Sequence, residues 1–69
     1  MAYLCVDKNG KEKIFNNMPS RDGFGTNDTF WAIFDYYGEN DYGVDLPDGT
    51  IFRLIGRELT WEDEPVVFE

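Results

Sequence analysis

The sequence contains no histidine and a single cysteine, Cys5. Zinc sites built from Cys and His, and Cys–His or Ser–His catalytic machinery, are therefore excluded. One cysteine also excludes an intramolecular disulfide, whereas small secreted domains usually carry several. Because Leu4 and Val6 flank Cys5 in an apolar run, we expect Cys5 to be a buried structural thiol. The absence of disulfides leads us to expect a cytoplasmic protein.

Long apolar runs are also missing. No stretch approaches the roughly 20 apolar residues that span a bilayer, and no signal peptide is evident. A phosphate-binding loop is missing too, since Gly23-Phe24-Gly25 has neither the spacing nor the lysine of a P-loop. We therefore expect no membrane insertion and no nucleotide cofactor.

Basic residues are few and unevenly placed. Six Lys and Arg stand against 14 Asp and Glu, which gives a net charge of −8. Residues 1–21 carry a balance of +2, whereas residues 22–69 carry −10. Nucleic acid and anionic membranes are bound by Lys and Arg, so neither is an expected partner of the acidic part. A basic protein surface is its natural complement.

Two apolar runs near the N-terminus predict a hairpin. Residues 2–7 and 11–15 are strand-like, and Asn9-Gly10 between them is a strong turn signal because both positions tolerate positive φ. We interpret the lysines of this hairpin as a solvated sheet edge. Residues 19–27, rich in Gly, Asn and Asp, are predicted to form a loop.

The segment 30–37 fits either a helix or a strand. As a helix, it would be capped by Thr26 or Asp28 and would end at Gly38, with its apolar residues on one stripe. As a strand, its alternate side chains would face opposite sides of a sheet. Its aromatic richness, together with Ile33, favours the strand.

A second ambiguity follows at Pro47-Asp48-Gly49. This is a turn sequence, which would make 50–55 another strand. The apolar residues of 50–55 instead lie at helical spacing and are followed by Gly56, which favours a short helix capped by Thr50. Further short strands are expected at 42–46, 59–61 and 66–68.

Together these elements predict an α+β fold, a small and mainly antiparallel β-sheet with one short α-helix. The 69 residues are 42% apolar and 17% aromatic, so we expect one compact domain over 1–69. A chain this short buries only about 60% of its unfolded surface, so each large side chain matters. The predicted core is Leu4, Val6, Ile14, Phe15, Trp31, Ile33, Ile51, Leu54, Ile55, Leu59, Trp61 and Val66.

Residues 22–52 form an acidic and aromatic tract that has no Lys or Arg. It holds seven carboxylates and eight aromatic side chains. Alternate residues of an extended chain lie roughly 6.7 Å apart, so these carboxylates can form a dispersed row that matches a Lys- and Arg-lined groove. Tyrosines would add rigid amphipathic anchors. The predicted partner-binding residues are Asp35, Tyr36, Tyr37, Glu39, Asp41, Tyr42, Asp45 and Asp48.

Other uses of the carboxylates are less favoured. Two close pairs resemble those of glycoside hydrolases: Glu39 with Asp41, and Glu62 with Glu64. Such pairs arise by chance among 14 carboxylates, and little in the chain indicates a substrate cleft. The acids of 35–45 lack the spacing of an EF-hand. We therefore expect no enzyme, metal or cofactor, and the alternative role for the acids is solubility alone.

Several runs of the sequence form a wider pattern: Cys5 to Gly10, then Phe15, Pro19 and Arg21, and later Leu46 to Ile51, Leu54 to Arg57 and Leu59 to Val66. This pattern resembles a small uncharacterised family of short proteins from gut bacteria and their phages. It covers most of the chain except the acidic middle, and the resemblance implies no assigned activity. The family has Lys where this chain has Asp48, which favours a surface adapted to a particular partner.

In size and charge, though in no motif, the chain also resembles the small acidic inhibitors made by phages and mobile elements, including anti-CRISPR proteins that mimic DNA. This resemblance implies a decoy that occupies a basic nucleic-acid-binding site on a partner complex, such as a CRISPR effector, in the bacterial host cytoplasm. It implies no direct contact with nucleic acid or membrane, and it leaves the oligomeric state open. The alternative is a structural or accessory module that uses exposed aromatics for protein–protein interaction and inhibits nothing.

Overall fold

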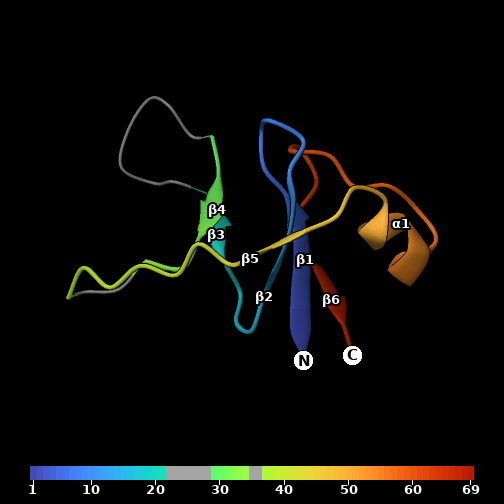
Figure 1. The fold of residues 1–69 in the computed structure, drawn as a ribbon. Helices are drawn as coiled ribbons and strands as arrows, with labels where there is room; N and C mark the ends of the chain where they lie inside the picture. The colour runs from blue at the N-terminus through green and yellow to red at the C-terminus, as the bar shows by residue number, and fades with distance from the viewer. Residues whose placement is uncertain (22–28, 35–36) are drawn as a thin grey trace.

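The computed structural model describes residues 1–21, 29–34 and 37–69. These residues form a four-stranded antiparallel sheet in the order β5-β2-β1-β6, a two-stranded sheet of β3 and β4, and one short helix (Figure 1). The predicted α+β fold class is confirmed. The elements are β1 (Ala2–Val6), β2 (Glu12–Phe15), β3 (Ser20–Arg21), β4 (Trp31–Ala32), β5 (Val44–Leu46), α1 (Thr50–Ile55) and β6 (Val66–Phe68).

The predicted hairpin of β1 and β2 forms the centre of the main sheet. Leu4 pairs with Ile14 and Cys5 with Lys13, and the glycine of the Asn-Gly turn has a φ of 88°. The expectation that the hairpin lysines mark a solvated edge is wrong for Lys13. Strands β5 and β6 flank the hairpin, and the Lys13 side chain is only 11% exposed.

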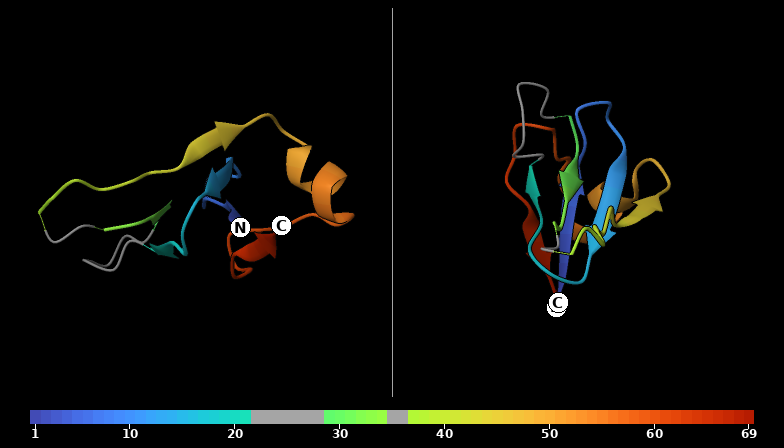
Figure 2. Two further views of the ribbon diagram at one scale, coloured as in Figure 1. Left: turned by 90° about the horizontal axis from the view of Figure 1, so that it is seen from below. Right: turned by 90° about the vertical axis from the view of Figure 1, so that its left-hand side faces the viewer.

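Alternation of side chains along β1 and β2 gives the main sheet two apolar faces. On one face, Leu4 and Val6 pack with Ile51 of α1 and with Leu59. On the other face, Cys5 and Phe15 pack with Trp31 of β4. The main sheet therefore lies between α1 on one side and the β3–β4 sheet on the other (Figures 1 and 2).

Most of the predicted core is confirmed. Leu54 is the exception, being 40% exposed. Ile51 and Ile55 lie one helical turn apart and pack into the apolar cluster on the sheet. Leu54 is not part of this cluster. The remaining predicted core residues are buried or half-buried: Leu4, Val6, Ile14, Phe15, Trp31, Ile33, Ile51, Ile55, Leu59, Trp61 and Val66.

Helix α1 has the predicted bounds, Thr50–Ile55, and the following glycine has a φ of 79°. Its N-terminal cap differs from the prediction. Gly49 occupies the cap position, and the Thr50 hydroxyl donates back to the preceding turn. The carboxylate of Glu12 in β2 accepts the backbone N–H groups of Gly49 and Ile51 at 2.6 and 2.8 Å, which satisfies donors that a helix start leaves unpaired.

The expected strand at 59–61 is wrong, because Thr60 begins a turn. The Asp63 carboxylate accepts the N–H of Thr60 at 2.8 Å, and the N–H of Asp63 donates to the Thr60 carbonyl at 3.1 Å. The strand at 66–68 is confirmed as β6. No helix in the part of the chain that the structure describes is long and apolar enough to cross a membrane.

Residues 19–37 were predicted to contain a loop followed by a strand. The expected loop at 19–27 contains β3, since Ser20 and Arg21 pair with β4, while 22–27 lie outside the described residues. In the segment 30–37, β4 and a bridge at Ile33 confirm the strand for those positions. Residues 35–36 lie outside the described residues.

Candidate functional site

Residues 29–34 and 37–43 form an arm that extends from the side of the main sheet (Figures 1 and 2). Ile33 and Asp41 hold its two sides together. The N–H of each donates to the carbonyl of the other, at 2.8 and 2.9 Å. The arm then continues into β5, which is an edge strand of the main sheet.

Four predicted site carboxylates follow this path from the arm to the start of α1. Glu39 and Asp41 lie on the arm, Asp45 on β5 and Asp48 in the turn before α1, and all four are exposed. None of them forms an ion pair within the described residues. We call these four residues the acidic strip.

The predicted tyrosines of this surface are also exposed where the structure describes them. Tyr37 is 85% exposed, and Tyr42 is about half exposed. Tyr42 is held by a ring contact to Phe30 at 5.7 Å and by Asn40, whose side-chain amide donates to the Tyr42 hydroxyl at 3.2 Å. The remaining predicted site residues, Asp35 and Tyr36, lie outside the described residues.

The acidic strip is not the regular row expected from an extended chain. Gly43 has a φ of 75°, which interrupts the alternation of side chains between Asp41 and Asp45. Asp41 accommodates this bend, because its carboxylate accepts the N–H of Gly43 at 2.8 Å. The strip therefore follows a bent path from the arm to α1.

The arm is fastened to the main sheet through Trp31. Its backbone N–H donates to the Asp7 carboxylate at 2.9 Å, and its indole N–H donates to the Val6 carbonyl at 3.0 Å. The other Asp7 oxygen pairs with the Lys13 ammonium at 2.9 Å, and Asp7 is only 5% exposed. A buried carboxylate is tolerated here because a cation and an N–H compensate it.

Sequence reasoning missed the role of Asp7, although the hairpin register contained a signal for it. Asp7 follows the last residue of β1, and Lys13 lies two positions beyond its cross-strand neighbour Lys11. Such diagonal neighbours on one sheet face can reach each other with long side chains. This pair supports the arm and leaves the Lys13 side chain largely buried.

Arg21 links the arm to the C-terminal segment. Its guanidinium carbon lies 4.4 Å from the Trp31 ring centroid and 5.1 Å from that of Trp61. The same group donates to the Trp61 carbonyl at 2.9 Å and to the Glu64 carboxylate at 3.3 Å. The two indole rings meet edge to face at 5.7 Å. Arg21 is therefore engaged within the fold.

The Cys5 thiol is buried as predicted. Its pKa is raised to about 12, mainly by burial and to a smaller extent by the nearby negative charge of Asp7. The thiol is therefore protonated at neutral pH and is a poor nucleophile or metal ligand. Within the described residues, no group of three or more His, Cys, Asp or Glu side chains lies close enough to hold a metal ion.

The arrangement as a whole is suited to contact with another macromolecule through charge and exposed aromatic surface. Comparison with protein-family models, with curated protein sequences and with solved structures finds no match to the chain. The resemblances inferred from the sequence therefore stay predictions.

Proposed function

We propose that the protein is a non-catalytic acidic inhibitor, a decoy that occupies a basic nucleic-acid-binding site on a partner protein complex in the bacterial cytoplasm. The acidic strip is the observation that carries the proposal. Its four carboxylates are exposed and form no ion pair within the described residues, and no Lys or Arg occurs between Arg21 and Arg53. A groove that binds phosphates with Lys and Arg is complementary to such a surface. A CRISPR effector complex is one partner of this class.

The exposed tyrosines support the same proposal. Charge steers two proteins together and sets specificity, whereas buried aromatic anchors supply much of the affinity. Tyr37 and Tyr42 lie on the arm beside Glu39 and Asp41. The arm thus combines carboxylates for a basic groove with rings that can pack inside it.

The test uses charge reversal at two strip residues, Glu39 and Asp48, whose carboxylates form no ion pair or hydrogen bond within the described residues. We expect Glu39→Lys with Asp48→Lys to weaken capture of a nucleic-acid-binding complex from bacterial lysate by at least about tenfold, because each reversal turns attraction into repulsion. Glu69→Lys, an exposed reversal outside the strip, is the control. Mass spectrometry identifies the captured complex, and capture should weaken steeply with salt.

Two outcomes contradict the decoy. One is a complex that the double variant captures as well as the wild type does. The other is a captured complex that high salt does not release, since screening leaves apolar contacts intact. Circular dichroism of the double variant confirms that it is folded.

A second function is favoured by the apolar side chains of the same region. Tyr37 and Tyr42 on the arm and Val44 on the edge strand β5 are all exposed. An accessory module that self-associates through these residues would form a concentration-dependent oligomer that tolerates salt. Sedimentation of the wild type and of Val44→Thr at two salt concentrations separates this module from the decoy.

A further inference from the structure

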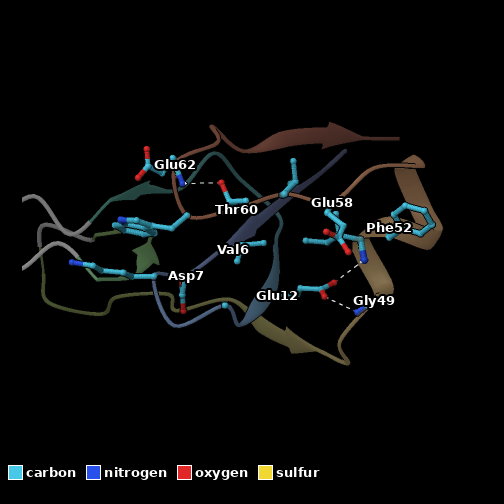
Figure 3. A pocket seen from close by; sticks show the side chains of 13 residues that line it. Val6, Asp7, Glu12, Gly49, Phe52, Glu58, Thr60 and Glu62 are labelled. Atoms are coloured by element: carbon cyan, nitrogen blue, oxygen red, sulfur yellow. Dashed lines mark hydrogen bonds between the residues drawn. The ribbon is translucent and has the colours of Figure 1, made fainter.

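A groove opens on the α1 side of the main sheet, between the tip of the β1–β2 hairpin, the start of α1 and segment 58–62 (Figure 3). Its volume is about 500 Å³, within the range of small-ligand and side-chain pockets. Val6, Ile51 and Leu59 form its floor. These three side chains are buried and packed together, so the floor is fixed by the core.

Phe52 gives the groove an exposed apolar wall. It is 54% exposed although it is the largest side chain of α1. Its neighbour in the helix, Ile51, reaches the core, whereas Phe52 lines the α1 end of the groove with its ring on the outer side of the helix (Figure 3). An aromatic ring beside a concave apolar floor offers a contact for an inserted apolar side chain.

The charges around the groove are predominantly negative. Four carboxylates and one lysine line it: Asp7, Glu12, Glu58, Glu62 and Lys8. Asp7 is compensated by Lys13, and Glu12 accepts two N–H groups at the start of α1. Glu58 and Glu62 are exposed and form no ion pair within the described residues. They lie at the two ends of segment 58–62, which forms one wall (Figure 3).

We propose that this groove binds a short segment of a partner protein that carries an apolar side chain between basic residues. The apolar side chain packs on the floor and against Phe52, and flanking Lys or Arg side chains pair with Glu58 and Glu62. Charge complementarity selects this occupant, because an acidic segment would be repelled at both ends of the wall. The proposal is independent of the acidic strip and requires no decoy function.

The test is a titration of the ¹⁵N-labelled protein with three synthetic peptides, followed by amide chemical shifts. The first peptide has one leucine between two pairs of arginines. The second replaces the leucine with glycine, and the third replaces the arginines with glutamates. We expect saturable shifts around Val6, Gly49 and Leu59 with the first peptide, at least about fivefold weaker binding of the second, and no binding of the third.

Variants then locate the binding site. Phe52→Ala should weaken binding of the first peptide about tenfold, and Glu58→Gln about threefold, as expected for one aromatic contact and one exposed charge. Leu54→Ala, at another exposed apolar residue of α1, and Glu39→Gln, in the acidic strip, are matched controls that should bind as the wild type does.

Two results would overturn the proposal. Equal binding of the leucine and glycine peptides would show attraction by charge alone. Binding that tolerates Phe52→Ala and Glu58→Gln but is lost in Glu39→Gln would place the peptide on the acidic strip. The second result leaves the decoy function standing. Capture that survives the charge reversals in the acidic strip contradicts the decoy but leaves the groove standing, so the two proposals fail separately.

Discussion

The buried ring of Phe15 lies directly against Gly43. A β-carbon built at Gly43 would fall 2.7 Å from Cζ of that ring, a separation that β-carbons in proteins essentially never show. Gly43 also has a φ of 75°, in the left-handed region that L side chains rarely adopt. Both constraints act where the arm meets β5, so glycine is required there by space as well as by conformation.

Gly43→Ala should therefore lower the free energy of unfolding by about 2–4 kcal/mol, the sum of a left-handed alanine and an overpacked core. Gly38→Ala is the matched control. Gly38 has a similar φ of 83°, but nothing lies within 4 Å of its built β-carbon, so a loss of only about 1–2 kcal/mol is expected. Urea unfolding measures both, and equal losses would refute the role of Phe15.

The ion pair of Asp7 and Lys13 should be costly to break from one side. Asp7→Asn leaves the nearly buried Lys13 ammonium without its counter-charge, which we expect to cost about 3 kcal/mol of unfolding free energy. Lys13→Met should cost a similar amount. The double variant should recover part of the loss, because no buried charge then remains uncompensated. Strict additivity of the two losses in urea unfolding would contradict this coupling.

Arg21 should not be replaceable by lysine. Its planar group stacks near both Trp31 and Trp61 and donates to two acceptors, a geometry that an ammonium cannot reproduce. We expect Arg21→Lys to cost about 1 kcal/mol of unfolding free energy and to change tryptophan fluorescence. Arg57→Lys, at an exposed arginine after α1, is the control and should change neither.

The Cys5 thiol should make stability depend on alkaline pH. Its folded pKa of about 12 lies above the unfolded value of 9.0, so ionisation favours the unfolded chain. The contribution to stability is complete below pH 9.0 and is lost as pH rises toward about 12, at about 1.4 kcal/mol per pH unit.

Cys5→Val provides the comparison, because tyrosines and lysines titrate in the same range. As pH rises above 9.0, the wild type should lose unfolding free energy relative to Cys5→Val, by about 1.4 kcal/mol per pH unit. A difference that stays constant with pH would show that the thiol ionises alike in both states. Slow alkylation of Cys5 in the native protein at neutral pH provides a second check.

Local chemistry made part of the fold predictable. The Asn9-Gly10 turn and the helix ending at Gly56 depend on positive φ at glycine and on apolar spacing, which neighbouring residues set by themselves. The strand expected at 59–61 failed for a tertiary reason. Leu59 and Trp61 alternate like strand residues, but they pack into the clusters on the two different faces of the main sheet.

The candidate site was predictable to the same limited degree. Exposure of Glu39, Asp45 and Asp48 follows from the chemistry of their side chains. The bent path of the acidic strip could not be predicted, because Gly43 combines a left-handed φ with a close contact to Phe15, a residue far away in the sequence. The groove was equally hidden, since it is assembled from the hairpin, α1 and segment 58–62.

The two hydrogen bonds between Glu12 and the start of α1 also have a consequence for folding. A helix of six residues does not persist alone in water, because nucleation costs more than so few hydrogen bonds return. The N–H groups of Gly49 and Ile51 can donate to Glu12 only when β2 is in place. The Ile51 side chain can pack against its apolar neighbours only when β1 is in place. We expect the hairpin to form first from local contacts, and the helix to appear and melt together with the sheet as one cooperative unit.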